Sequence, residues 1–262
     1  MRALSIAKFE EGIINEDAVR ATEKWIAISD GAGGGGVFAE LWSKYLVDHV
    51  PDNPIVDFGG LDKWLDKIWE PFYNYCEAKA KVEGGMILNK FYDEGSYATL
   101  TTIWSTGQWI SYGDSVAFCY NSRTGELQHS FGRIVEFNNP PYLMNCKDPL
   151  NEKGVRIGKF DVCPESLFFA ASDTLAHYVL MMYELAHKEK YAVELQEAID
   201  AQTKNSNYIK IGMCLKAIDF RHSVIRKLTN CKNEWNFERH ILSLRKKGLI
   251  GHDDYSFAFM QV

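Results

Sequence analysis

The sequence predicts an α+β fold, a layered sandwich of antiparallel β-sheet and helices. Segments typical of strands lie near both ends and in the middle of the chain, and amphipathic helical stretches lie between them in blocks. A doubly wound parallel sheet would instead alternate strand and helix regularly. The chain of 262 residues is long enough for one large core. Because it shows no repeat and no linker, we expect a single domain over residues 1–262.

The first third of the chain is predicted to form two strands followed by two helices. Residues 1–8 alternate loosely and indicate a strand, and the apolar run 24–29 indicates a buried strand. The second strand should end at Asp30-Gly31, where a glycine-rich stretch begins. Apolar residues then recur at helical spacing over 37–50 and again over 61–73.

The middle of the chain changes to the period of β-strands. Three short segments, 98–104, 108–112 and 115–120, are rich in β-branched and aromatic residues and are separated by turn residues. We expect them to form an antiparallel meander, followed by a hairpin turn at 123–125. Asn and Pro residues then predict a loop region over roughly 138–155.

The last third is predicted to be a strand, a block of helices and a closing strand. The apolar segment 167–172 indicates a buried strand that ends at Asp173. Helical periodicity dominates from 175 to about 244. The chain closes with a predicted strand over 256–262, which is entered through Asp253-Asp254.

Composition excludes several functional classes. The net charge is −6 and no Lys/Arg-rich run occurs, which argues against a nucleic-acid partner. No apolar run of 18 residues occurs, so we expect no membrane span, and the charges near the N-terminus come too early for a secretory signal. The six cysteines include no Cys-x-x-Cys pair, which is typical of free, buried thiols in a reducing compartment. We therefore expect a cytoplasmic protein.

Acidic residues stand at the ends of the predicted buried strands. Asp30 and Asp173 each follow one, Asp253 precedes one, and Glu16-Asp17 lies just upstream of the strand at 24–29. If these strands are neighbours, the carboxylates gather, and such like charges require a cation to remain ionised. Mg²⁺ and Mn²⁺ prefer oxygen ligands of this kind. The alternative is that each aspartate is only a turn residue or a helix N-cap, and Asp173 before Thr174 has the pattern of a cap.

Six short motifs occur in the order found in the metal-dependent protein phosphatase family (type 2C), and they span residues 15 to 262. Each motif alone is weak, but their shared order makes the resemblance specific. The chain resembles this family, and more closely its bacterial branch, at Asn15-Glu16-Asp17-Ala18, Ile26–Gly34, Gly95–Leu100, Tyr112-Gly113-Asp114-Ser115, Phe168–Ala176 and Asp253–Ala258.

The resemblance implies a four-layer α-β-β-α sandwich with two antiparallel sheets and two divalent ions, Mn²⁺ or Mg²⁺, at one end. It implies that Asp30 bridges both ions and that one ion is also bound by Asp173 and Asp253. The Gly31 carbonyl would bind the other ion, supported by Glu16 and Asp17 directly or through water. Asp254 occupies a position where the family usually has Asn, so it either supports the metal ligands without touching an ion or is solvated.

Three positions depart from the family pattern. Ala32 replaces a His that many bacterial members also lack. Gly12 replaces an Arg that binds the substrate phosphate, and Arg20 and Lys8 are the candidates for that role. Thr174 replaces a Gly, as in the bacterial branch that the resemblance favours.

The function that the resemblance implies is hydrolysis of phosphoserine and phosphothreonine on proteins by a metal-activated water. No Ser/His/Asp or Cys/His pair is then needed, because the metal supplies the nucleophile. The expected partner is a phosphorylated protein, with no nucleic acid and no membrane. Two alternatives remain open: a catalytically weak or inactive phosphatase-like regulatory or binding module, motivated by Gly12, and an α+β protein whose aspartates are only turns and caps.

Overall fold

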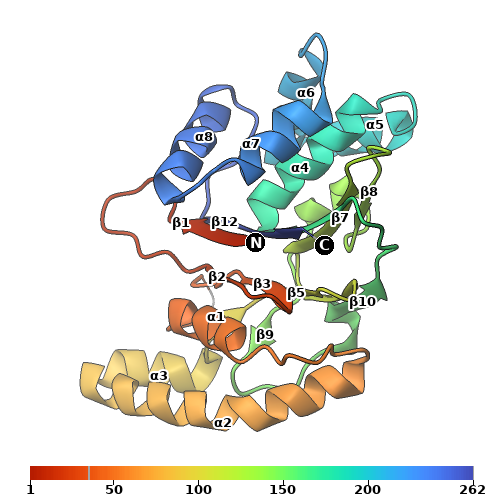
Figure 1. Ribbon diagram of the computed structural model, residues 1–262. Coiled ribbons are helices and arrows are strands. Elements are labelled where there is room, and N and C mark those ends of the chain that lie inside the picture. Colours follow the sequence, from red (N-terminus) through yellow and green to blue (C-terminus); the bar gives the residue numbers. More distant parts are fainter. Residues whose placement is uncertain (35, 262) are drawn as a thin grey trace.

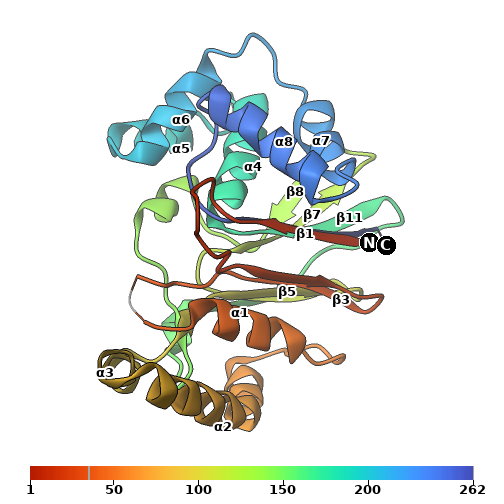
Figure 2. The ribbon, with the colours of Figure 1, turned by 90° about the vertical axis from the view of Figure 1, so that its left-hand side faces the viewer.

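Helices cover both outer faces of two stacked β-sheets in the computed structural model, which describes residues 1–34 and 36–261 (Figure 1). The layers follow in the order helix, sheet, sheet, helix, and Figure 2 shows the two sheets edge-on. Within the described residues all strand pairs are antiparallel. The predicted four-layer α+β sandwich is therefore confirmed.

In the described part of the chain, one sheet has the strand order β1-β12-β11-β7-β8 and the other the order β10-β6-β5-β3-β2. A separate short pair joins β4 to β9. The strands are β1 (Arg2–Ile6), β2 (Ala18–Ala21), β3 (Trp25–Ser29), β4 (Tyr97–Ala98), β5 (Leu100–Trp104), β6 (Gln108–Tyr112), β7 (Val116–Asn121), β8 (Leu127–His129), β9 (Met144–Asn145), β10 (Val155–Lys159), β11 (Ser166–Ala171) and β12 (Tyr255–Gln261).

The central strands are buried on both faces, which explains their continuous apolar sequences. In β3, Ile26 and Ile28 belong to the core between the sheets, and they share it with Phe168 of β11. Successive side chains of a strand point to opposite faces. Trp25 and Ala27 accordingly pack in the core beneath the other face, against the helices. This double burial fixes β3, and with it the position of the residue that follows the strand.

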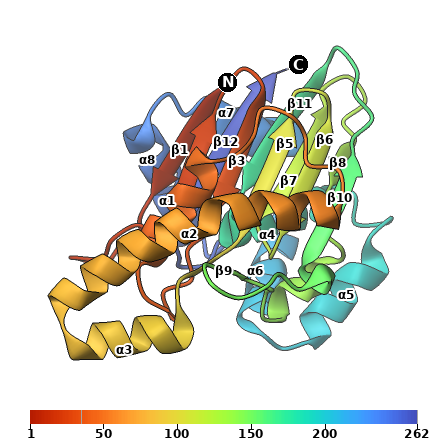
Figure 3. The same cartoon turned by 90° about the horizontal axis from the view of Figure 1, so that it is seen from below.

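Three helices cover the sheet that contains β3: α1 (Ala39–Asp48), α2 (Phe58–Glu83) and α3 (Gly85–Glu94). Trp42 of α1 is fully buried and packs in the same core as Trp104 of β5. The long helix α2 runs across this face of the molecule (Figure 3). The predicted helices 37–50 and 61–73 are confirmed, although α2 is longer than predicted because its apolar stripe continues through Cys76 and Ala80.

The other sheet is covered by helices from the last third of the chain (Figure 1). The helix next to the sheet, α4 (Asp173–Ala186), is buried along almost its whole length. Around it lie α5 (Ala192–Asp200), α6 (Lys204–Met213), a π-helical turn η3 (Arg221–Ile225), α7 (Arg226–Thr229) and α8 (Glu234–Lys246). The predicted strand 256–262 is found as β12, and Val262 lies outside the described residues.

The sequence prediction was wrong about one strand pairing. β5 and β6 form the predicted hairpin, but β7 crosses to the other sheet and pairs with β11 and β8. The three segments are therefore not a meander. Because the chain changes sheets between β6 and β7, the Gly113-Asp114-Ser115 turn spans the end of the sandwich.

Several short elements were not predicted. The expected loop region 138–155 contains β9 and the 3₁₀ turn η2 (Glu152–Gly154), and it follows another turn, η1 (Ile134–Asn138). The strands β2 and β10 lie at the edges of their sheet and are only partly buried. An edge strand has one paired neighbour, so its sequence carries a weaker apolar signal. Within the described residues, no helix is both long and apolar enough to cross a membrane.

Candidate metal centre

Asp17 and Asp30 are brought together by strand register. In their sheet Ala18 pairs with Ser29, so Asp17 directly precedes β2 and Asp30 directly follows β3 at the same end. The backbone of Asp30 is held on its other side by Thr99, whose hydroxyl accepts a hydrogen bond from the Asp30 N–H at 3.1 Å. The two acidic residues therefore lie at one end of neighbouring strands.

The other sheet brings three more acidic segments to one end. Ala171 of β11 pairs with Val116 of β7 and with Phe257 of β12. The segments 172–173, 113–115 and 253–254 therefore leave the sheet side by side. The pKa of Asp30 is raised well above its usual value by burial and by the charges of Asp17, Asp173, Asp114 and Asp253, which places both groups of carboxylates at the same end.

Asp17 is a buried carboxylate of this centre that lacks hydrogen-bond donors within the described part of the chain. Its side chain is buried, and neither carboxylate oxygen accepts a hydrogen bond from the described residues. Burial raises its pKa to about 7, and Asp254 and Asp253 add to the shift. The hydroxyls of Ser256 and Ser172 lie near enough to Asp17 to oppose this shift, although neither is placed to form a well-aligned hydrogen bond with its carboxylate. A buried carboxylate without a donor is costly unless a cation compensates it.

Asp173 is not the N-cap of α4. The cap position is Ser172, and Asp173 is the first helical residue, with Oδ1 accepting a hydrogen bond from the Thr174 N–H. Burial and the neighbouring charges of Asp114 and Asp253 raise its pKa well above the usual value. Asp173 is therefore the first residue of α4 and not its N-cap, although its carboxylate accepts a backbone N–H of the first turn.

Asp114 belongs to the same centre, and the sequence analysis did not assign it as a site residue. Burial raises its pKa to about 6, while the guanidinium of Arg156 lowers it. In the sequence, its Gly-Asp-Ser turn stands out only as one of the six motifs shared with the phosphatase family. The signal that could have identified it is an acidic residue in the short turn between two buried strands.

Asp254 fixes the backbone around the acidic centre and is not solvated. It is buried, with Oδ1 accepting a hydrogen bond from the Lys8 N–H and Oδ2 one from the Glu16 N–H, each at 2.7 Å. This ties the segment before β2 to the start of β12. Asp253, in contrast, is partly exposed. Its partial burial and the charge of Asp254 raise its pKa.

The glycine-rich segment packs closely against Glu16. A Cβ atom on Gly31 would lie 2.5 Å from the backbone oxygen of Glu16, and one on Gly33 would lie 2.0 Å from Glu16 Oε1. A side chain is therefore excluded at Gly31 by backbone atoms, and at Gly33 it would displace the Glu16 carboxylate. Burial raises the pKa of Glu16, and the Gly33 N–H and Lys8 oppose the shift. Glu16 thus lies between the glycine loop and the start of β12.

Among the cations named by the sequence analysis, Lys8 lies near the centre and Arg20 does not. Lys8 lowers the pKa of both Glu16 and Asp253, whereas Arg20 is paired with Asp48 at 3.0 Å on the surface. Gly12 has a φ of 76°, a left-handed conformation that strains any other residue. A Gly12→Arg replacement would therefore strain the backbone of this loop, although the space around the position is open.

These residues fit a divalent cation chemically. The donor set is almost entirely carboxylate oxygen, which suits Mg²⁺ and Mn²⁺. The orphaned oxygens of Asp17 and the mutual repulsion of Asp30, Asp173 and Asp114 would both be relieved by bound positive charge. Among residues 1–34 and 36–261, no three such side chains already stand in ligand geometry around one point. Binding would therefore have to draw the carboxylates inward.

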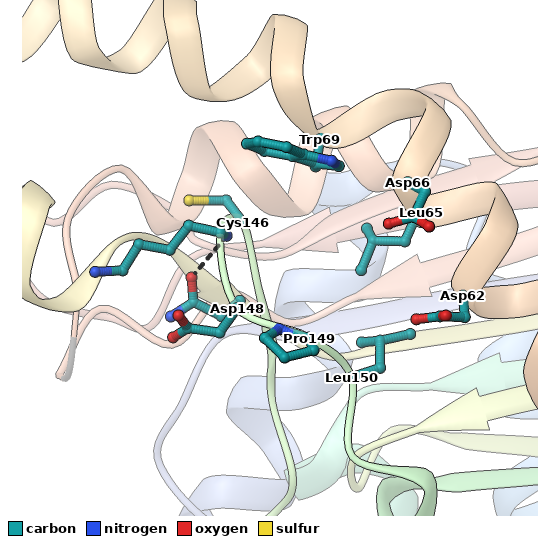
Figure 4. A pocket seen from close by; sticks show the side chains of 10 residues that line it. Asp62, Leu65, Asp66, Trp69, Cys146, Asp148, Pro149 and Leu150 are labelled. Atoms are coloured by element: carbon teal, nitrogen blue, oxygen red, sulfur yellow. Dashed lines mark hydrogen bonds between the residues drawn. The ribbon is translucent and has the colours of Figure 1, made fainter.

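A cavity elsewhere in the molecule is separate from this centre. It has a volume of about 270 Å³ and lies between α2 and the loop 145–150 (Figure 4). Its lining includes Trp69 and the carboxylates of Asp62, Asp66 and Asp148, but none of the strand-end aspartates. The acidic centre is thus formed at the end of the sandwich and not in this cavity.

Comparison with solved structures finds similar proteins, whereas comparison of the sequence does not. No family model matches the sequence, and no curated protein is significantly similar to it. Among solved structures, the chain is similar to the serine/threonine phosphatase PstP/Ppp of Mycobacterium tuberculosis, with a TM-score of 0.53, 18% identity and coverage of 98% of this chain and 96% of that one.

Two further structures show the same likeness. The PPM Ser-Thr phosphatase MsPP of Mycobacterium smegmatis, solved with cacodylate, has a TM-score of 0.52 and 13% identity over 100% of this chain and 98% of that one. The phosphatase Stp1 of Staphylococcus aureus has a TM-score of 0.50 and 15% identity over 99% and 94%. The likeness extends over the whole length of each chain. The protein therefore has the fold of the metal-dependent (PPM, type 2C) serine/threonine phosphatases.

Proposed function

We propose that this protein is a metal-dependent phosphatase that hydrolyses phosphoserine and phosphothreonine on proteins. The fold is shared with enzymes of this activity. The observation that carries the proposal is the buried carboxylate of Asp17, which has no hydrogen-bond partner and lies among other strand-end aspartates. A structural turn or cap would not leave both oxygens of a buried carboxylate unsatisfied.

The carboxylates would hold two divalent ions, Mn²⁺ or Mg²⁺. We assign Asp30, Asp173 and Asp253 as ligands, with the Gly31 carbonyl, and Glu16 and Asp17 as supports. Bound ions of this kind supply a water of lowered pKa, near ~7, and positive charge for the phosphoryl oxygens.

The protein's own part is to position these ligands. The double burial of β3 and β11 fixes Asp30 and Asp173, and Asp254 holds the backbone of Glu16 through a hydrogen bond of 2.7 Å. We assign Asp254 as a supporting group that touches no ion, because both its oxygens are occupied by backbone N–H donors. Asp114 lies near enough to Asp173 to raise its pKa, and it adds negative charge to the acidic centre.

The direct test is phosphate release from a phosphothreonine peptide in the presence of Mn²⁺ or Mg²⁺. We expect turnover with at least one of the two ions and none after treatment with a chelator. Folded protein that binds the peptide and Mn²⁺ but releases no phosphate would instead support the regulatory-module alternative. Failure to bind Mn²⁺ at all by calorimetry would leave the aspartates as structural residues.

A second prediction concerns Lys8, which we propose as the contact to the substrate phosphate in place of the missing Arg. Lys8→Gln should raise KM for the phosphopeptide by about tenfold, since one charge-assisted hydrogen bond is worth roughly 1.5 kcal/mol or more. The value of kcat should change little if the contact is equally strong in ground and transition states. Steady-state kinetics measure both quantities.

The matched control for this prediction is Lys63→Gln, which removes an exposed lysine from α2, on the outer helical layer. Its KM should equal that of the unmodified protein. Equal KM values for Lys8→Gln and the unmodified protein would show that Lys8 does not contact the phosphate.

A further inference from the structure

One part of the helical layer that covers β12 and β11, residues 204–249, is strongly basic, although the protein as a whole is acidic. Residues 204–249 carry eleven Lys and Arg against three Asp and Glu, a net charge of +8, in a chain whose net charge is −6. These residues include α6, α7 and α8, which lie together on one side of the molecule (Figure 1). A field of this sign attracts anions to that face.

A cavity of about 280 Å³ lies within this layer, between α4, α8 and the segment 215–218. Its floor is apolar and includes Met182 and Leu244, and its rim includes Lys227 and Lys247. The lining contains no Asp or Glu. The cavity is slightly smaller than the usual range of small-molecule pockets, about 300–1,000 Å³, which limits an occupant to a small molecule.

The two rim lysines have no partner of opposite charge. Neither Lys227 nor Lys247 forms an ion pair within residues 1–34 and 36–261. Both lie near enough to His240, which also lines the cavity, to add to the effect of burial and lower its pKa to about 4. The histidine is therefore neutral at pH 7, and its Nε2 has no hydrogen-bond partner in the described chain. Two like charges thus flank one cavity without compensation.

A tyrosine hydroxyl also lines the same cavity. The Tyr178 side chain is 1% exposed and belongs to α4. Its hydroxyl makes no hydrogen bond to any described residue, and burial alone accounts for the raised pKa of the phenol. The oxygen is not among the fully enclosed polar atoms of the described residues, so it remains accessible from the cavity. A donor of this kind, in a cavity with two unpaired lysines, is suited to an anionic acceptor.

We propose that this cavity binds a small organic anion, with its carboxylate or phosphate head at Lys227, Lys247 and the Tyr178 hydroxyl and its apolar body against Met182 and Leu244. The site is independent of the phosphatase centre. Its lining residues include none of the strand-end carboxylates that form the metal centre. The shared chemistry is an anionic head on an apolar body.

The test is calorimetric titration of the metal-free protein with three six-carbon probes: hexanoate, hexylphosphonate and the neutral hexan-1-ol. Chelator prevents the anions from binding through a metal ion. We expect at least one of the two anions, the one whose head group fits the site, to bind at least about tenfold more tightly than hexan-1-ol. The reason is that hydrogen bonds to a charged group are stronger than those between neutral groups. NMR should show shifts of the Met182, Leu244 and Leu249 amides. Equal binding of the three probes, or shifts confined to other regions, would overturn the proposal.

Two variants separate the roles of the residues. Lys227→Gln/Lys247→Gln should weaken anion binding about tenfold or more and leave hexan-1-ol unaffected. Tyr178→Phe keeps the packing of the ring and should weaken anion binding about two- to tenfold. The control is Lys63→Gln/Lys67→Gln, an exposed pair on α2 at the opposite face. Anion affinity unchanged by the double lysine variant contradicts the site, and affinity unchanged by Tyr178→Phe contradicts the role of the hydroxyl.

Discussion

Asp173→Asn should abolish metal-dependent phosphate release, by at least about 100-fold, while leaving the protein folded. Loss of groups that only support a metal ligand already costs about 10–100-fold, and Asp173 is assigned as a ligand itself. An amide oxygen is a poorer ligand for a hard cation than a carboxylate. The measurements are phosphopeptide turnover and Mn²⁺ binding by calorimetry.

The fold should tolerate this change because Asp173 does not cap α4. Removing one charge from the first turn loses a favourable helix-dipole interaction of about 0.3–1 kcal/mol. It also removes the repulsion from Asp114 and Asp253, so the metal-free variant should melt at or above the temperature of the unmodified protein. Asp66→Asn, at an exposed position of α2, is the matched control and should behave as the unmodified protein. Full activity and Mn²⁺ affinity in Asp173→Asn would remove the assignment.

The metal-free protein should become more stable as the pH falls from 8 to 6. The carboxyl groups of Asp17 and Asp114 titrate near 3.8 when unfolded, but burial raises their pKa to about 7 and about 6 in the folded protein. Between these values the folded state binds more protons than the unfolded state, so stability falls as the pH rises. For Asp17 alone, a shift of about three units corresponds to roughly 4 kcal/mol at pH above 7.

Mn²⁺ should reverse this dependence, because it stabilises the ionised carboxylates that protons otherwise neutralise. Between pH 6 and pH 8 these two carboxyls change the free energy of unfolding by roughly 1.8 kcal/mol. We therefore expect thermal melts in chelator to show a melting temperature about 4–7 °C higher at pH 6 than at pH 8, given a shift of ≈ 2–4 °C per kcal/mol for a chain of this size. Saturating Mn²⁺ should raise the melting temperature most at pH 8. Asp17→Asn should flatten the profile in chelator. A flat profile for the unmodified protein would contradict the raised carboxyl pKa values.

The sequence patterns are clearest for the elements that are strongly buried in the structure. The strand at 24–29 and the strand at 167–172 were predicted because both their faces are apolar, and they are found as β3 and β11. Their burial follows from the apolar side chains that they themselves carry. Asp30 and Asp173 could be singled out as the residues that follow them, and the structure brings these two carboxylates together with Asp17 and Asp253.

The edge elements were missed for a physical reason. β2 and β10 have only four and five residues and are partly buried, so neither shows a full apolar face. They become strands because β3 and β6 offer them backbone partners. Likewise α3 begins at Gly85, directly after a glycine with a φ of 107°, which sequence patterns describe as a break.

The sequence by itself determined the order of the buried strands, the amphipathic helices and the acidic residues at the strand ends, because each depends on side chains close together in the chain. Only the tertiary structure decided that β7 crosses to the other sheet and carries Asp114 into the acidic centre. It also decided that Asp254 holds backbone N–H groups and that Lys8, not Arg20, lies beside the carboxylates. These contacts join residues up to 246 positions apart, so their partners are set by strand register and layer packing.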